Sequence, residues 1–213
     1  MDATKHVGAT SRRAYSPKQA TLQRSYEDVV QIFAQSQCCL TPTVSGPGLA
    51  KLFEMEPQMR DDPRFSIYTH WLQRYATGRL RNVPGESTVL GSLAAVRVES
   101  AKLAVGAMHA GAKIVVGTDT PNSFALHRKL ETYIMAGMTL WEALRAATVT
   151  PAEELDFDAG SIEPGKLADL DIVDGNPLED IADAHKIKEV IANGRLYTGE
   201  DLISGNTQSS VMH

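Results

Sequence analysis

The fold is decided by the stretch Ala110-Gly-Ala-Lys-Ile-Val-Val-Gly-Thr-Asp119. Its centre, Ile114-Val115-Val116, is a continuous β-branched run, which is typical of a strand buried on both faces of a parallel sheet. In (β/α) barrels, reactive groups gather at the carboxyl ends of such strands. We therefore expect Asp119 to lie at a strand end, ahead of a helix over residues 125–136 that Gly137 terminates.

The residues on either side alternate between helix and strand patterns. Residues 26–33 repeat apolar side chains at helical spacing, and residues 38–44 form a strand-like run that a Ser-Gly-Pro-Gly turn stops. Residues 88–110 predict a longer helix, and capping boxes at 139–142 and 150–153 open two more. This alternation predicts an α/β fold with a parallel sheet and helical crossovers.

The pattern changes towards the C-terminus. Residues 168–174 predict a strand, and residues 188–197 predict a β-hairpin across Asn193-Gly194. We therefore divide the chain near residue 151. Residues 1–150 form the α/β part, and residues 151–213 form a helix followed by a small β part.

Composition excludes several classes of protein. With 43% hydrophobic and 22% charged residues, the 213-residue chain has the composition of a globular protein. No apolar run approaches the ~18 residues of a membrane span, and residues 1–18 lack the apolar core of a signal peptide. The net charge of −5 weighs against a nucleic-acid binder. The adjacent pair Cys38-Cys39 provides no disulfide framework, so we expect a cytoplasmic protein with no membrane or nucleic-acid partner.

Two residues are candidate metal ligands. Asp119 could ligate a metal or act as a base, although an aspartate at this position can equally cap a helix or close a turn. His6 precedes Val7-Gly8, at what could be another strand end, and neutral imidazole is a good zinc ligand. A histidine near a terminus can also be incidental. The residues alone leave these alternatives open.

Three further residues are weaker candidates for binding substrate. His127 falls in the first turn of the helix after Asp119 and could reach the same strand ends, or it could be a solvated helix residue. Arg12 and Arg13 would follow His6 in a loop, where they could hold a substrate carboxylate bidentately. A solvated loop would explain the two arginines equally well.

Several blocks between residues 110 and 200 occur in the order and spacing of one enzyme family. They are Ala110–Asp119, Ala136-Gly-Met-Thr-Leu-Trp-Glu-Ala-Leu-Arg-Ala-Ala-Thr148, Thr150-Pro151-Ala152-Glu153, Gly160-Ser-Ile-Glu-Pro-Gly-Lys-Leu-Ala-Asp-Leu170, Asp174-Gly-Asn-Pro-Leu-Glu-Asp-Ile181 and Val190-Ile-Ala-Asn-Gly-Arg-Leu-Tyr197. The blocks resemble the last strand, last barrel helix and C-terminal segment of the metal-dependent amidohydrolase superfamily. The imidazolonepropionase- and dipeptidase-like branch is the most similar. Residues 1–45 resemble the sixth and seventh strands of its barrel.

The resemblance implies a fold and a chemistry. The family folds as a (β/α)₈ TIM barrel with a small β-sandwich, and it hydrolyses C–N bonds in small amides, cyclic amides and dipeptides. Its divalent metal, commonly zinc, lowers the pKa of water towards ~7 and polarises the scissile carbonyl. The resemblance makes Asp119 the strand-eight metal ligand that also accepts the proton of the attacking water. It makes His6 the strand-six ligand.

The chain also departs from the family pattern. No His-x-His pair, the family's strand-one ligands, occurs in the 213 residues. The resemblance therefore covers only the C-terminal half, namely strands six to eight and the last strands of the sandwich. We expect a hydrolase fragment that is inactive alone and pairs with a complementary N-terminal half or forms a homo-oligomer. The alternatives are one half of a split enzyme and a non-catalytic interaction module.

Overall fold

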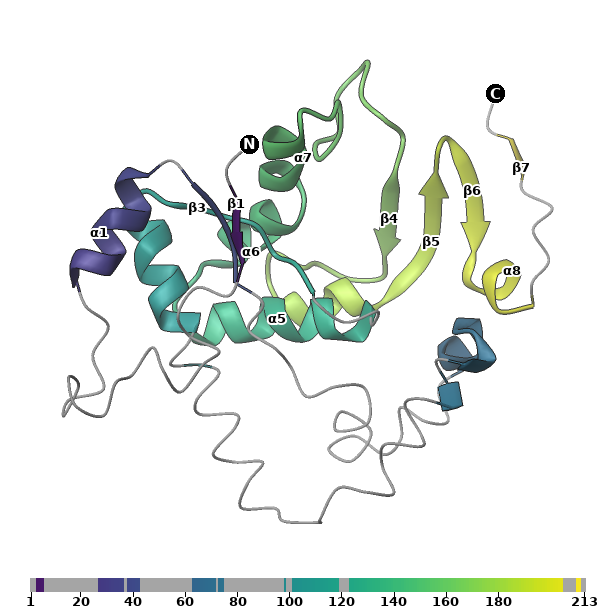
Figure 1. Cartoon of the computed structure of the whole chain (residues 1–213). Helices are drawn as coiled ribbons and strands as arrows, with labels where there is room; N and C mark the ends of the chain where they lie inside the picture. Colours follow the sequence, from purple (N-terminus) through teal and green to yellow (C-terminus); the bar gives the residue numbers. More distant parts are fainter. Residues whose placement is uncertain are drawn as a thin grey trace, which may run out of the picture. The chain divides into compact units, whose positions relative to one another are not determined.

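A computed structural model of the chain describes residues 3–5, 27–36, 38–42, 63–71, 73–74, 98, 101–118, 123–204 and 210–211 (Figure 1). The chain divides into two compact units. Unit 1 comprises residues 1–45 and 86–162, and unit 2 comprises residues 46–85 and 163–213. None of the helices in the described residues is long and apolar enough to cross a membrane.

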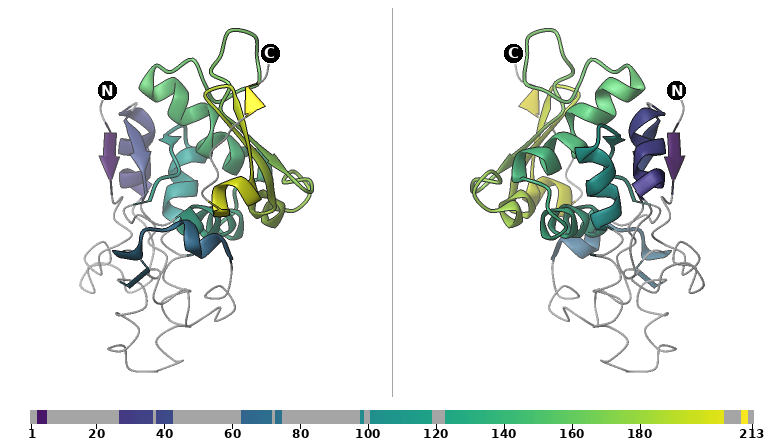
Figure 2. Two further views of the ribbon diagram at one scale, coloured as in Figure 1. Left: turned by 90° about the vertical axis from the view of Figure 1, so that its right-hand side faces the viewer. Right: turned by 90° about the vertical axis from the view of Figure 1, so that its left-hand side faces the viewer.

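Unit 1 contains a parallel sheet of the kind predicted. Strands β1 (Ala3–Lys5), β2 (Cys39–Thr41) and β3 (Lys113–Ile114) lie side by side in the order β1-β2-β3. β2 is therefore the central strand, and Leu40 at its middle is fully buried. The extended backbone continues past β3, since the Val115 amide donates to the Leu40 carbonyl at 2.8 Å. Figure 2 shows β1 at the outer margin of this unit.

The helices of unit 1 form where apolar residues recur at helical spacing. In α1 (Glu27–Gln35), Val30 and Ala34 lie four residues apart and both are buried. Residues 101–109 are helical, and the following Gly111 has a φ of 112°, which suits a glycine at a helix C-terminus. The next helix, α5 (Ser123–Met135), runs below the strands in Figure 1.

Two shorter helices complete unit 1, and one of them corrects a prediction. At the start of α6 (Leu140–Ala147), the predicted capping box is present. The Thr139 hydroxyl accepts from the Glu142 amide at 3.2 Å, and the Glu142 carboxylate accepts from the Thr139 amide at 2.8 Å. The capping box predicted at residues 150–153 is wrong, because α7 (Val149–Leu155) already begins at Val149, without a side-chain cap. Pro151 is tolerated inside the first turn, where its missing N–H has no intrahelical partner to lose.

Unit 2 is built on an antiparallel sheet. Strands β4 (Leu170–Val173), β5 (Ile187–Ala192), β6 (Arg195–Thr198) and β7 (Ser210–Val211) pair in that order. The hairpin between β5 and β6 turns at the predicted pair. Asn193 has a φ of 50° and Gly194 a φ of 73°, which is the positive-φ pairing of a type I′ turn. The shorter helical elements are η2 (Pro63–Ile67), η4 (Ile181–His185) and α8 (Gly199–Ser204).

One side-chain network in unit 2 explains part of the C-terminal sequence pattern. The Asp183 carboxylate accepts a hydrogen bond from the backbone N–H of Asn176 at 2.8 Å and forms an ion pair with Lys186 at 2.7 Å. Gly175 lies so close to this carboxylate that an added Cβ would meet it, and the φ of Gly175 is 145°. Asp174-Gly175-Asn176 is therefore a turn that is built around Asp183.

Candidate functional site

The carboxyl ends of the three parallel strands lie at one edge of the unit 1 sheet. In the register of β1 and β2, Lys5 pairs with Thr41, the last residue of β2. Beyond β3, Gly117 approaches the same residue so closely that a Cβ on Gly117 would lie 2.5 Å from Cγ2 of Thr41. The three chain segments therefore converge at Thr41.

The residues predicted to do chemistry follow these strand ends in the sequence. His6 comes directly after Lys5, and Asp119 comes two residues after Gly117. His6, Arg12, Arg13 and Asp119 all lie outside the described residues. Their roles stay predictions. The described structure provides the strand ends from which the chain leads into them.

Two buried side chains of α5 reach this edge. The Lys129 side chain is only 2% exposed, and its ammonium donates a hydrogen bond to the Gly117 carbonyl. One turn further along α5, Tyr133 is fully buried and donates through Oη to the Pro42 carbonyl at 2.8 Å. Burial raises the pKa of the Tyr133 phenol, so the group stays protonated as a donor.

Sequence reasoning did not single out either residue. Residues 125, 129 and 133 follow one another at intervals of four, so they share one face of α5. The signal available was a lysine inside an otherwise apolar face, since the other two residues are alanine and tyrosine.

His127, the fifth candidate, lies within the described residues. It is half-buried on α5. Because it is two residues before Lys129, it lies about 200° away around the helix axis. The two side chains therefore occupy different faces of α5.

The amino ends of β2 and β3 carry a different set of groups. Cys39 pairs in register with Lys113, whose ammonium forms an ion pair with Glu154 of α7 at 2.5 Å. The pKa of the Cys39 thiol is raised, mainly by burial and also by the nearby Glu154 carboxylate. The thiol is thus held in its neutral form, which is neither a good nucleophile nor a metal ligand.

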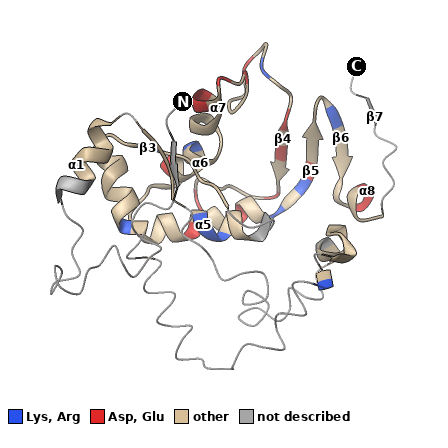
Figure 3. Cartoon of the chain, in the orientation of Figure 1, with Lys and Arg blue, Asp and Glu red and all other residues tan. Residues whose placement is uncertain are grey.

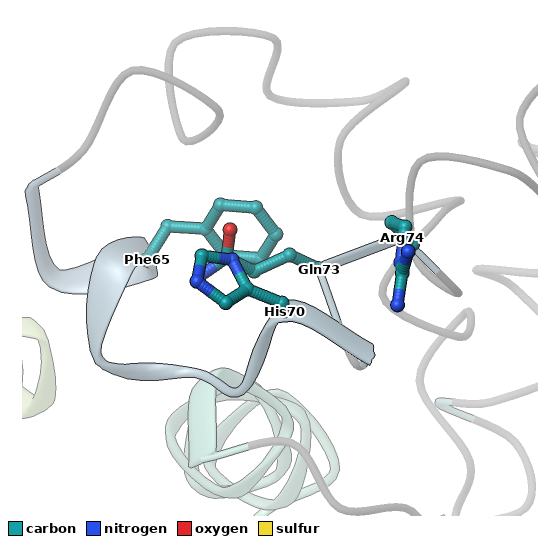
Figure 4. Close-up of a pocket in the computed structure, with 4 residues that line it drawn as sticks. All are labelled: Phe65, His70, Gln73 and Arg74. Carbon is teal, nitrogen blue, oxygen red and sulfur yellow. The ribbon is translucent and has the colours of Figure 1, made fainter.

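A pocket lies among the described residues of unit 2. A cavity of about 480 Å³ is lined by Phe65, His70, Gln73 and Arg74. Figure 4 shows the first three side chains gathered, with Arg74 apart from them in this view. The Gln73 amide is occupied with its own chain, because it donates to the Tyr68 carbonyl at 2.6 Å.

The described residues contain neither a preformed metal cluster nor a block of one charge. No group of three or more His, Cys, Asp and Glu side chains in this part of the chain could hold a metal ion. Both acidic and basic residues are spread over the ribbon (Figure 3), for example acidic residues on α7 and β4 and basic residues on β5 and β6. A metal site with three or more such ligands would therefore need residues from outside the described ranges, where His6 and Asp119 lie.

Comparison with known proteins points to one family. The model of the amidohydrolase family matches residues 83–197. The chain is 43% identical to an adenine deaminase of Methanosphaera stadtmanae over 58 residues. These residues make up 27% of this chain and 10% of that protein.

Solved structures give the fold. A Xaa-Pro dipeptidase with methionine bound in its active site matches with a TM-score of 0.55 and 23% identity, over 93% of this chain and 40% of that one. A bottromycin amidohydrolase matches with a TM-score of 0.61 and 18% identity, over 97% of this chain and 49% of that one. The chain thus has a mixed α/β fold similar to that of amidohydrolase TIM-barrel proteins, and it spans less than half the length of these structures.

Proposed function

The chain belongs to the amidohydrolase family, and we propose that it supplies the C-terminal part of a metal-dependent hydrolase acting on C–N bonds. The residues that carry this function are Asp119 and His6. The family generally uses a divalent metal ion, and a histidine nitrogen with a carboxylate oxygen is a donor set that suits zinc.

One observation supports the proposal above the others. The strand that leads to His6 ends at Lys5, opposite Thr41, and the chain that leads to Asp119 passes the same Thr41 at Gly117, three residues beyond β3. Parallel strands end at one edge of their sheet, so ligands that follow two of them can serve one ion. A histidine and an aspartate scattered at random would not be led to one edge.

In this proposal the chain's own residues have distinct tasks. His6 and Asp119 hold the ion, and Asp119 also accepts the proton of the attacking water. A bound divalent ion would polarise the scissile carbonyl. It would also lower the pKa of water, so that water could lose a proton and attack near neutral pH. The buried thiol of Cys39, held neutral at the opposite edge of the sheet, takes no part.

The finer fold assignment follows from the same proposal. β1, β2 and β3 correspond to strands six, seven and eight of a (β/α)₈ barrel, and the unit 2 sheet corresponds to the last strands of the family's β-sandwich. The division into a barrel part, residues 1–150, and a C-terminal part, residues 151–213, belongs to this proposal as well.

The substrate is proposed only as a class. It is a small amide, cyclic amide or dipeptide, in a compartment we propose to be the cytoplasm. Arg12 and Arg13 would hold an anionic group of the substrate, and His127 is a further candidate for contact with it. In a barrel, loops from all eight strands shape the pocket, so these three residues cannot define the substrate alone.

A second candidate function rests on the sheet edges. In the described structure, β1 and β3 each pair with β2 alone, so each has an outer edge. Parallel sheets are normally enclosed, and an open edge invites pairing with another chain segment. The chain could thus act by binding a complementary N-terminal half or a second copy, as part of a split enzyme or as a non-catalytic interaction module.

An activity assay, together with measurements of metal uptake and oligomeric state, separates these functions. The purified chain is supplied with Zn²⁺ and offered amides, cyclic amides and dipeptides, with the variant Asp119→Asn assayed in parallel. We expect no turnover by the chain alone, because the sequence lacks the family's His-x-His pair. Turnover at ordinary enzymatic rates that Asp119→Asn abolishes would overturn the proposed inactivity. An oligomer without metal uptake would favour the interaction module.

A further inference from the structure

Two buried donors on one face of α5 hold the ends of two different strands. The Lys129 ammonium bonds to the carbonyl of Gly117 beyond β3, and the Tyr133 hydroxyl bonds to the carbonyl of Pro42, directly after β2. Both side chains rank among the largest fully buried ones in the molecule. One helix is thus hydrogen-bonded to the chain just beyond β2 and just beyond β3, and the proposed metal ligand Asp119 follows the second of these points in the sequence.

The burial of Lys129 is the informative part of this arrangement. Lysine is almost never fully buried, because removing an ammonium from water is costly unless polar partners compensate it. An apolar residue of the same length would fill this position on α5 without that cost. A buried cation beside a strand end therefore points to a task at that end beyond packing.

The Gly117 carbonyl shows where this task lies. Gly117 lies three residues beyond the end of β3, and a Cβ added to it would stand 2.5 Å from Cγ2 of Thr41. The backbone here is held from two sides, by the close contact with β2 and by the Lys129 ammonium. Thr118 and Asp119 follow directly in the sequence.

We propose that Lys129 is a positioning residue of the metal site: by binding the Gly117 carbonyl, its ammonium fixes the chain where β3 leads into Asp119. Tyr133 does the same for the chain that leaves β2 at Pro42. The inference rests on the proposed function only for the metal that Asp119 binds. The positioning of the two strand ends can be tested without it.

Hydrogen exchange of the full-length chain tests the positioning directly. Lys129→Met keeps the apolar stem but removes the ammonium, and Tyr133→Phe removes only the hydroxyl. In Lys129→Met, we expect amides in residues 115–121 to exchange at least about tenfold faster, since hydrogen bonds to charged groups are the stronger ones. In the same variant, the exchange rates of amides in residues 38–44 should change by less than about twofold. In Tyr133→Phe, the amides of residues 38–44 should exchange faster and those of residues 115–121 should change little.

Cobalt binding then tests the consequence for the metal. Titration with Co²⁺, followed by its visible absorption bands, should show weaker binding and altered bands in Lys129→Met. Tyr133→Phe should affect the bands less, and Asp119→Asn should abolish them. Altered bands in a folded variant report a change in ligand geometry, which a loss of overall stability would not produce.

The outcomes separate this inference from the proposed function. If the unmodified chain binds no Co²⁺ but each variant loosens its own strand end, the positioning stands and the metal site proposed for this chain fails. If both variants accelerate exchange equally across unit 1, or neither does, the positioning role is wrong and Lys129 only fills the core. Co²⁺ bands in Lys129→Met that match those of the unmodified chain would overturn its role at the metal site.

Discussion

Gly117 and Thr41 lie so close that a single added carbon on Gly117 would stand 2.5 Å from the Thr41 methyl group. The contact joins the chain beyond β3 to the last residue of β2. Because Thr41 also pairs in register with Lys5 of β1, the chain segments of all three strands come together at this residue.

Gly117→Ala should therefore destabilise the chain. The added Cβ would overpack against the Thr41 methyl group, which its neighbours on the strand hold in place. This should lower the free energy of unfolding by about 1–3 kcal/mol. Urea denaturation monitored by circular dichroism measures this. The matched control is Gly106→Ala in the helix of residues 101–109, where an added Cβ meets nothing within 4 Å. That control should be neutral or stabilising by up to about 1 kcal/mol, since alanine is the better helix former. Equal effects in both variants would refute the close contact.

The capping box of α6 gives a second prediction. Thr139→Ala removes the hydroxyl that accepts from the Glu142 amide, and should cost about 1 kcal/mol of stability. Thr139→Ser keeps the hydroxyl and should stay near the unmodified chain. The hydrogen bonds from Thr139 hold the pKa of Glu142 below its usual range. If the alanine and serine variants unfold at the same denaturant concentration, the cap does not stabilise α6.

Acid should weaken the network around Asp183 in unit 2. The hydrogen bond from Lys186 is the main cause that holds the pKa of Asp183 below its usual range, and the hydrogen bond from the backbone N–H of Asn176 adds to it. The folded state thus binds fewer protons than the unfolded state. The stabilisation is present at neutral pH and lost as the pH falls below about 4.

Asp183→Asn tests that pH dependence. The variant should be less stable than the unmodified chain at pH 7, and the difference should shrink as the pH falls through the acid range. Thermal unfolding between pH 7 and pH 3 measures it. Asp158→Asn, at an exposed carboxylate outside the network, serves as the control. A difference that stays constant over the whole range would show that the Asp183 charge contributes nothing.

The two adjacent cysteines should differ in reactivity. Cys39 is 3% exposed and its pKa is raised, mainly by burial, whereas Cys38 is half-buried. Because the thiolate is the reactive form, iodoacetamide at pH 8 should modify Cys38 first and Cys39 only on unfolding. Peptide mass spectrometry distinguishes the two positions. Equally fast modification in the folded chain would contradict the buried, neutral thiol.

Local sequence chemistry predicted the elements that carry their own signals. The Thr139–Glu142 capping box and the Asn193-Gly194 turn are each satisfied by residues a few positions apart, so no tertiary information was needed. The predicted start of α7 was wrong. Thr150-Pro151-Ala-Glu153 fits a capping box, but the helix begins at Val149. Helix boundaries depend on packing against neighbours as much as on the capping residues.

The candidate site was predictable in part, for a similar reason. A strand-end aspartate can be recognised from a buried run and the turn that follows it, as with Ile114 to Asp119. Lys129 could not be assigned this way, because its partner, Gly117, is 12 residues away and offers only a main-chain carbonyl. A carbonyl leaves no mark in the sequence, so only the folded chain shows what the buried ammonium binds.

The central claim is that this chain contributes His6 and Asp119 to one metal site, and zinc titration tests it most directly. Zn²⁺ is titrated against a chromophoric chelator in separate samples of the unmodified chain, Asp119→Asn, His6→Asn and the control His109→Asn. In the unmodified chain, His109 lies 3.5 Å from the Glu142 carboxylate. We predict one zinc per chain, lost in Asp119→Asn and in His6→Asn and retained in His109→Asn. No zinc in the unmodified chain, or uptake that neither Asp119→Asn nor His6→Asn reduces, would contradict the account.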